Sequence, residues 1–342
     1  MPIPERQRST LRRTRQPRGR FAVNFFTLFA ARAAVGVGEA AYVTIAPALL
    51  ADCFSRAQRG RVLSVFNMAI PVGAALGYIV GGLVGAHWGW RAAFFVAGVP
   101  GVVLAASVLW LPDPPRGAQD GLPGATAPAA QMASPLAIYL GLLKRWPYLI
   151  VVLGYAAYTF GLGGLAFWMP TFLERVRHIP PAQATTGFGV IVLVTGFVGT
   201  FAGGWLGDRL LRLSRQAYLW FSGALTLLAV PCALLALLAP DPGVYYPAIV
   251  AAQLLLFMST GPINAAIVNI AGPLERASAI ALSMFAIHLL GDVPSPALIG
   301  RVSHLSSLGE ATLIVPVAFA VAGVIWLIAA RVNARASQPA VA

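Results

Sequence analysis

The sequence predicts an all-α membrane protein with nine transmembrane helices, and both its composition and the length of its apolar runs favour this class. Hydrophobic residues make up 58% of the 342 residues and charged residues only 10%, whereas about a quarter of an average soluble domain is charged. Nine apolar runs are long enough, at about 1.5 Å per helical residue, to cross ~30 Å of hydrocarbon. Runs of this length do not suit porin strands, which need only about 10 residues each.

The nine runs divide the chain unevenly. Three precede and six follow the segment 112–147, whose prolines and glycines predict a flexible linker between two helical domains. The first domain then spans 21–111 and the second spans 148–333, with an arginine-rich tail at 1–20 and a short C-terminal tail at 334–342. The runs cover approximately residues 24–50, 62–86, 91–111, 148–173, 185–206, 217–239, 244–271, 277–300 and 311–332.

Basic residues are distributed unequally between the two sides of the predicted membrane. The turns after the first, third, fifth and seventh runs, together with the C-terminus, carry twelve Lys and Arg residues, whereas the opposite turns carry four. Because Lys and Arg are enriched in cytoplasmic loops, the C-terminus is expected in the cytoplasm. The seven arginines of residues 1–20 would fall on the other side, against this rule. Outside residues 1–20, the basic residues lie singly or in small groups between apolar runs, as is typical of membrane topology, and no nucleic-acid partner is expected.

Residues that would indicate catalysis or a bound cofactor are not recognisable in the sequence. The four histidines are scattered, and Cys53 and Cys232 show no metal-binding spacing. Neither a phosphate-binding loop nor a Ser/His/Asp set can be found. The sequence therefore predicts neither an enzyme nor a metal or cofactor site.

Two charged residues lie inside the first apolar run. Arg32 and Glu39 are seven residues apart, so a helix places them on one face, about 10.5 Å apart in height. An ionisable residue at this depth costs at least ~2.5 kcal/mol and is a functional candidate by default. Because burial favours the neutral form of a carboxyl group, Glu39 could bind and release protons near neutral pH. The alternative is a structural Arg–Glu tie between two helices.

Glycines recur every fourth residue in the second run, at Gly73, Gly77, Gly81 and Gly85. This spacing places them on one helix face, where a neighbouring backbone can approach closely in lipid. The face serves either for static packing or as a smooth surface on which helices slide during gating. Gly154 belongs to no such row and is expected to tolerate a larger side chain better than Gly77 does.

The fifth run ends in a glycine-rich and charged segment. Its glycines allow a tight helix end, its aspartate can cap a helix or pair with a base, and its arginines suit lipid headgroups. An ordinary charged helix end is the alternative. The residues concerned are Gly203, Gly204, Gly207, Asp208, Arg209 and Arg212.

Prolines and polar residues coincide in the seventh and eighth runs. Pro262 is expected to interrupt the seventh run near Asn264 and Asn269, and the segment 288–296 is expected to break the eighth run beside His288 and Asp292. Such breaks are tolerated in a membrane only where the backbone faces protein or water. They are typical of transporter helices that line a cavity. A capped kink near the outer surface is the alternative for the eighth run.

Three of these segments resemble one transporter family. The motif GGWLGDRLLR at 203–212 resembles the loop motif of the major facilitator superfamily. The motifs RAAVGVGEAAY at 32–42 and HLLGDVPSPALIG at 288–300 are similar to the Spinster-like branch of that superfamily. The resemblance extends over roughly residues 21–332.

This resemblance implies a fold of twelve helices in two six-helix halves, with the nine runs corresponding to family helices 4–12. It also implies a chain truncated at its N-terminus, with residues 1–20 outside the family pattern. Glu39 then falls on the position of a protonation site, with Arg32 as its partner or as a headgroup ligand and Tyr42 in the same pathway.

The function implied is secondary active transport, coupled to protons, of an amphipathic lipid-like or organic anion substrate. Membrane lipids and protons would be the further partners, and composition favours a bacterial inner membrane. Two alternatives remain open. The chain belongs to another branch, which carries drugs or small organic acids, or it is a membrane fragment that is inactive alone.

Overall fold

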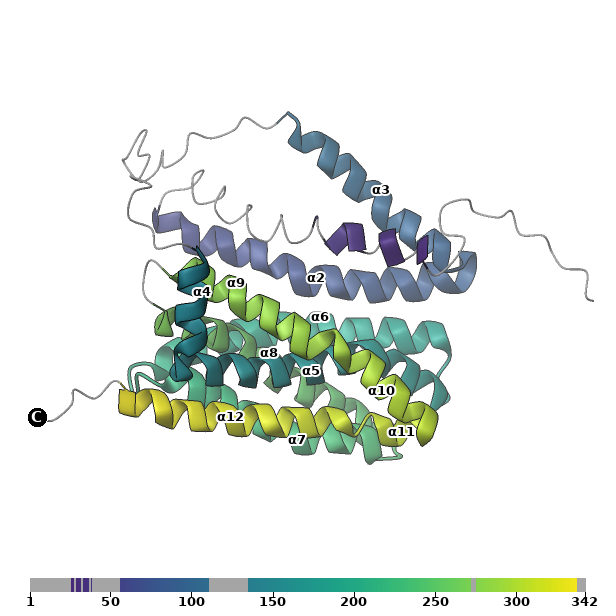
Figure 1. The fold of residues 1–342 in the computed structure, drawn as a ribbon. Helices are drawn as coiled ribbons and strands as arrows, with labels where there is room; N and C mark the ends of the chain where they lie inside the picture. The colour runs from purple at the N-terminus through teal and green to yellow at the C-terminus, as the bar shows by residue number, and fades with distance from the viewer. Residues whose placement is uncertain are drawn as a thin grey trace, which may run out of the picture. The chain divides into compact units, whose positions relative to one another are not determined.

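A computed structural model of the chain is built from helices and contains no strand among the residues that it describes (Figure 1). These are residues 26–27, 29–31, 33–36, 38, 56–110, 135–271 and 275–336. Two compact units are distinguished, one made of 1–66 and 108–125 and the other of 67–107 and 126–342. The second unit contains nearly all the described side chains.

The helices follow one another with short connections except between α3 and α4. Their bounds are α2 Arg56–Trp88, α3 Trp90–Val108, α4 Pro135–Lys144, α5 Trp146–Arg175, α6 Pro181–Leu210, α7 Ala217–Leu238, α8 Pro242–Ile270, α9 Arg276–Ile287, the π-helical turn η4 His288–Asp292, α10 Pro294–Leu305, α11 Leu308–Ala311 and α12 Ile314–Ala336.

Seven helical segments within the described ranges are long and apolar enough to cross a membrane, which confirms the expected fold class. They are α3, α5, α6, α7, α8, the combined stretch Ser278–Leu305 and the combined stretch Leu308–Ala334. A shorter apolar helix at Val72–Trp88 belongs to the expected second run. The expected first run, 24–50, lies mostly outside the described residues.

Proline begins three of the long helices. It stands in the first turn of α5, α6 and α8, where its missing N–H leaves no hydrogen bond unmade and its ring fixes a helical φ. Asp241 adds a cap to α8 by accepting a hydrogen bond from the Gly243 N–H at 2.9 Å. The chain reverses after α5 through His178, which adopts a left-handed φ of 58°.

The helices from α5 to α12 pack into a bundle. α5 and α7 both pack against α12, while α6 and α7 pack against α8. Trp326 of α12 is fully buried at the centre, where its indole N–H donates to the Val151 carbonyl at 3.2 Å. Gly154 makes this possible, because a Cβ there would lie 2.5 Å from the Trp326 ring. A larger side chain at Gly154 would therefore clash with Trp326, whereas a Cβ at Gly77 would meet no described atom within 4 Å, which is the reverse of the expected order.

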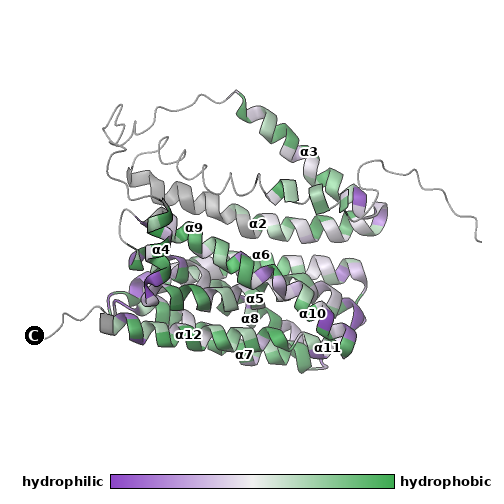
Figure 2. Cartoon of the chain, viewed as in Figure 1, coloured by the Kyte–Doolittle hydropathy of each residue, from purple (hydrophilic) through white to green (hydrophobic). Residues whose placement is uncertain are grey.

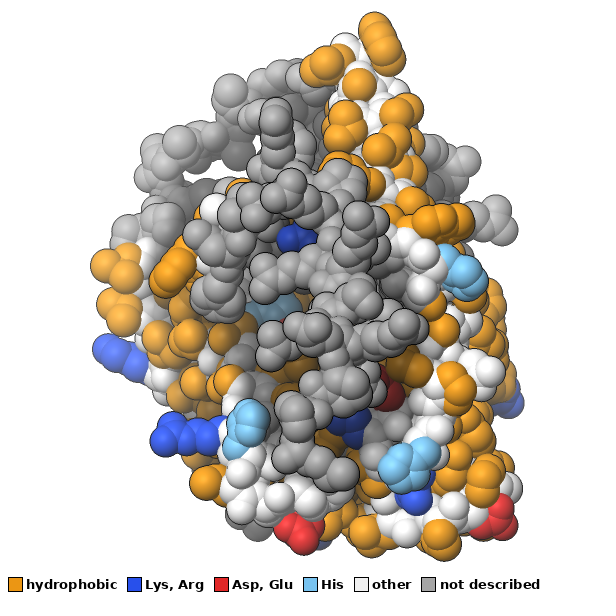
Figure 3. Space-filling view, turned by 90° about the vertical axis from the view of Figure 1, so that its right-hand side faces the viewer, with side chains coloured by type: hydrophobic (Ala, Val, Ile, Leu, Met, Phe, Trp, Pro, Cys, Tyr) orange, Lys and Arg blue, Asp and Glu red, His pale blue; other side chains and the backbone are white. Residues whose placement is uncertain are grey.

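Hydrophobic residues line the outer faces of the bundle as well as its core, and hydrophilic residues gather toward the two ends (Figure 2). A helix that is apolar all round suits a lipid environment. Viewed from the end that carries the α10–α11 turn, charged and histidine side chains are seen among hydrophobic ones (Figure 3). This distribution places the ends of the helices at the membrane–water boundary.

Two expectations about helix breaks need correction. Segment 112–147 is not irregular throughout, because α4 forms within it and buries Leu142. The seventh run is not interrupted at Pro262, because α8 runs without a break from Pro242 to Ile270. Proline removes only one hydrogen bond at that point, and the glycine-lined contact with α6 described below covers the affected turn.

Candidate functional site

Residues Arg32, Glu39 and Tyr42, the expected proton and substrate pathway, lie outside the described residues. Helical backbone is described beside them, at 33–36 and at Gly38. Their roles therefore stay predictions.

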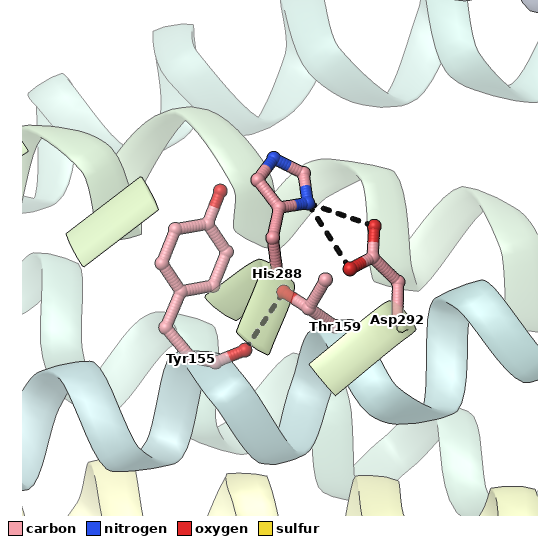
Figure 4. A network of polar contacts seen from close by, with 4 residues as sticks. All are labelled: Tyr155, Thr159, His288 and Asp292. Atoms are coloured by element: carbon pink, nitrogen blue, oxygen red, sulfur yellow. Dashed lines mark hydrogen bonds and ion pairs between the residues drawn. The ribbon is translucent and has the colours of Figure 1, made fainter. Parts of the chain in front are cut away.

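The clearest polar group within the described bundle is an ion pair on the π-helical turn. His288 Nδ1 lies 3.0 and 2.9 Å from the two carboxylate oxygens of Asp292 (Figure 4). Both side chains keep contact with solvent space, with exposed fractions of 60% and 34%. Polar atoms of both side chains are therefore accessible at the surface of the described bundle.

This turn is wider than an α-helical turn because the hydrogen bond closes over five residues. The Val293 N–H donates to the His288 carbonyl at 3.2 Å, and Pro294, which follows, has no N–H to offer the turn before it. π-turns of this kind occur frequently at functional sites. The expected break in the eighth run is therefore present, but as a widened turn rather than an unwound segment.

Two glycines let the π-turn lie directly on α5. A Cβ at Gly291 would lie 2.9 Å from the Ala156 carbonyl oxygen, and one at Gly163 would lie 2.6 Å from Asp292 Cβ. Further along, the Trp168 indole N–H donates to the Pro296 carbonyl at 3.1 Å. The position of Asp292 is consequently fixed by the backbone of α5.

Asn264 of α8 joins the same stretch of α5 from another side. Its amide Nδ2 donates to the Tyr155 hydroxyl at 3.2 Å and to the Thr260 carbonyl at 2.9 Å. Tyr155 is drawn beside His288 in Figure 4, with its hydroxyl and the imidazole ring pointing the same way. One turn further along α5, the Thr159 hydroxyl donates to the Tyr155 carbonyl at 2.8 Å.

Of the four residues expected to line a cavity, Asn264 contacts α5 at Tyr155, and Asp292, which is paired with His288, contacts it at Gly163, eight residues further along. Asn269 does not join them, because it lies at the end of α8 and lines a different cavity. Tyr155 and Thr159 were not predicted as site residues. Nothing in one sequence separates them from the other polar residues of apolar runs.

The segment 203–212 forms a close contact between α6 and α8. A Cβ at Gly203 would meet the Met258 backbone, including the carbonyl that Pro262 leaves without its usual helical donor, and one at Gly207 would lie 3.0 Å from the Pro262 ring. A Cβ at Gly204 would meet no described atom within 4 Å. The two backbones approach closely where glycine is required, as expected for small residues between helices in lipid.

The charged part of this segment faces the start of α7. The Tyr218 hydroxyl donates to Asp208 Oδ1 at 2.7 Å, and the Arg209 guanidinium lies 5.4 Å from the centre of the Trp205 ring. Arg212 is exposed. Asp208 therefore ties α6 to α7, while the arginines point outward.

The glycine row of the second run has no neighbour within the described part of the chain. A Cβ at Gly73, Gly77, Gly81 or Gly85 would meet no described atom within 4 Å. Contact with α6 is made instead by an adjacent face of α2, where a Cβ at Gly82 would lie 2.6 Å from the Thr186 hydroxyl oxygen. The role of the row in packing or gating stays a prediction.

An ion pair that the sequence did not reveal joins the α4–α5 junction to the residue before α9. Arg145 forms two hydrogen bonds with the carboxylate of Glu275, at 2.5 and 2.9 Å. Such a bidentate arrangement fixes the relative direction of the two side chains. One signal was available, because Glu275 is one of few acidic residues in the turns on its side of the membrane.

Comparison with known proteins agrees with this architecture. The model of the Major Facilitator Superfamily matches residues 19–296. Protein spinster homolog 3 of Danio rerio is 35% identical over 301 residues, which cover 82% of this chain and 58% of the relative. Sphingosine-1-phosphate transporter SPNS2 of Xenopus tropicalis is 32% identical over 331 residues, covering 89% of this chain and 63% of the relative. The chain thus spans somewhat less than two thirds of the length of these relatives.

A solved structure supports the same fold. The crystal structure of a bacterial homolog to the human lysosomal transporter Spinster, in an inward-facing and unoccupied conformation, superposes with a TM-score of 0.77 at 20% identity. The superposition covers 93% of this chain and 80% of that one. Proteins of this kind are transporters, not enzymes, as the sequence predicted. The chain is an integral membrane protein that belongs to the Major Facilitator Superfamily, and the relatives that it matches are Spinster proteins.

Proposed function

We propose that this chain forms the main part of a secondary transporter that moves an amphipathic, lipid-like anion across a membrane in a proton-linked cycle. The observation that carries the proposal is its similarity, over 89% of the chain, to a relative named as a sphingosine-1-phosphate transporter. The His288–Asp292 pair supports it, because ionisable residues within a membrane-spanning segment often mark the pathway of a substrate or ion.

In this proposal, two sets of polar residues have separate roles in transport. Glu39 would take up and release the coupling proton, with Arg32 as its partner or as a ligand of an anionic headgroup. The planar fork of arginine suits a phosphate through two hydrogen bonds. The His288–Asp292 pair, with Tyr155 and Asn264 nearby, would form the polar lining contributed by the second half.

The loop segment at 203–212 would act in gating, since it joins α6 to both α7 and α8. The use of arginine in place of lysine and the short loops favour a bacterial cytoplasmic membrane. The distribution of arginines would place the C-terminus in the cytoplasm.

Proteoliposomes that contain the purified chain test the proposal directly. Uptake of a labelled sphingoid phosphate should rise when a proton gradient is imposed, and Glu39→Gln should abolish this dependence while leaving the protein folded. Glu174→Gln, which removes an exposed carboxylate near the end of α5, is the matched control and should transport normally. Unchanged pH dependence in Glu39→Gln would show that Glu39 is only a structural tie.

Two further arms separate the alternatives. Transport of drugs or small organic acids, but not of lipid-like anions, would assign the chain to another branch. In the second of these arms, the chain is co-expressed with the first three helices of a Spinster relative. Transport only in that arm would identify the chain as inactive alone, and no transport of any substrate in either arm would reject the proposal.

A further inference from the structure

A cavity of about 620 Å³ opens at the end of the bundle opposite the α10–α11 turn. It lies where the α4–α5 junction, the start of α7 and the final turns of α8 and α12 meet. This volume is within the range of ligand-binding pockets, roughly 300–1,000 Å³. None of the polar groups on α5 that were assigned to transport lines it.

The described lining of this cavity is basic. It contains Lys144, Arg145 and Arg215 and no carboxylate. Arg145 is paired with Glu275, whereas neither the Lys144 nor the Arg215 side chain forms a hydrogen bond or an ion pair with any described residue. Asp208 does not line the cavity, but its carboxylate accepts a hydrogen bond from the hydroxyl of the lining residue Tyr218. Within the described part of the chain, the side chains of Lys144 and Arg215 therefore have no anionic partner.

Helix ends strengthen the positive potential. α5 begins at Trp146 and α7 at Ala217, next to the lining residues Arg145 and Gln216, and neither start is capped by a side chain. The positive end of the helix dipole favours an anion at such positions. The buried Asn333 amide holds the geometry by donating to the Ala329 carbonyl at 2.9 Å and the Pro147 carbonyl at 3.4 Å.

Apolar groups complete the lining. Trp146, whose exposed fraction is 57%, stands at the rim, and Ile270 and Leu219 also face the cavity. Tryptophan at the end of a transmembrane helix is typical of the membrane–water boundary. A ligand with a charged head and an apolar body matches this combination better than a fully hydrated anion does.

We propose that the cavity binds the phosphate group of an anionic membrane phospholipid, with Lys144 and Arg215 as its ligands and Trp146 against its glycerol and acyl portion. The site is separate from the proposed transport pathway and does not depend on transport. Basic pockets between transmembrane helices bind anionic headgroups in general, and the positive charge of Lys144 and Arg215 favours phosphatidylglycerol over a zwitterionic lipid.

Thermal unfolding of the full chain in nanodiscs tests the site. Discs of phosphatidylglycerol should raise the melting temperature relative to discs of phosphatidylcholine. The double variant Lys144→Gln, Arg215→Gln should lose at least half of this difference. A matched control, Arg175→Gln with Arg301→Gln, removes two exposed basic residues at the opposite end of the bundle and should keep all of it. Equal losses in the two double variants would overturn the proposal.

A second measurement identifies the source of the phosphate. Native mass spectrometry of the detergent-solubilised chain should show phosphatidylglycerol retained by the wild type and the control but not by Lys144→Gln, Arg215→Gln. Added inorganic phosphate should displace the lipid only weakly. Binding of inorganic phosphate that depends on the two cations, without retention of phosphatidylglycerol, would overturn the lipid assignment in favour of a soluble anion.

Discussion

At the scale of single residues, two glycines that look alike in the sequence can lie in different surroundings in the structure. Gly203 and Gly204 are neighbours in α6, yet only Gly203 faces the backbone of α8. Spacing alone does not separate them, because the distinction depends on which side of the helix the partner lies. Gly199, Gly203 and Gly207 form a row that packs on α8. The glycine row predicted from the sequence to pack closely against a neighbouring helix lies in α2 instead.

We predict that Gly203→Ala destabilises the protein by about 1–3 kcal/mol, because the added methyl group would press on the Met258 backbone, which has no flexible end to move aside. Gly204→Ala should be neutral or slightly stabilising, since it replaces a flexible helical residue in open space. Urea unfolding of the two variants in detergent, followed by tryptophan fluorescence, would measure the difference. Equal stability of both would contradict the contact.

At the scale of elements, the sequence predicted two proline-associated breaks, and only one is present. Pro262 lies in a helix whose neighbour α6 is lined with glycine, so the backbone of α6 covers the turn that lacks a hydrogen bond and α8 continues. The segment before Pro294 combines a proline with Gly291, which packs on α5, and there the helix changes its hydrogen-bonding pattern. Both outcomes depend on the neighbouring helix, and the local sequence does not contain that information.

We predict a measurable coupling between the α4–α5 junction and the start of α9. Arg145 and Glu275 are partly exposed, with exposed fractions of 46% and 25%, so their coupling free energy should be about 0.5–1 kcal/mol. A double-mutant cycle of Arg145→Gln and Glu275→Gln, measured by urea unfolding, isolates this term. The coupling should shrink at high salt. Strictly additive single variants would show that the pair contributes nothing to stability.

At the scale of the whole molecule, hydropathy and charge alone predicted the fold class, because lipid imposes the length and the apolar surface of every crossing. The resemblance of three short motifs then added the family. The packing inside the bundle could not be predicted from the sequence, because the burial of Trp326 against Gly154 depends on two helices that are far apart in the chain. The lipid environment determines the composition of the helices, whereas the neighbouring helices determine the close contacts between side chains.

We predict that the α6–α7 turn faces the cytoplasm and the α10–α11 turn faces the opposite side. Leu213→Cys and Leu305→Cys are a matched pair, because these leucines are 79% and 83% exposed in the two turns. In a background without Cys53 and Cys232, a membrane-impermeant maleimide should label Leu305→Cys in intact cells. It should label Leu213→Cys only after permeabilisation. The reverse pattern would invert the topology.

The π-turn at His288–Asp292 also sets the relation between the two parts of one membrane crossing. One additional residue in a helix rotates everything after it by about 100° and shifts it by about 1.5 Å. α9 and α10 therefore present faces that a continuous helix would not align, and Ser295 and Ile299 are turned toward Gly164 of α5 by this offset. Deleting Leu289 or Leu290 would restore an ordinary helix, but it would rotate α10 away from α5. The two ends of this crossing consequently pack against α5 with different helical phases, because one additional residue separates them.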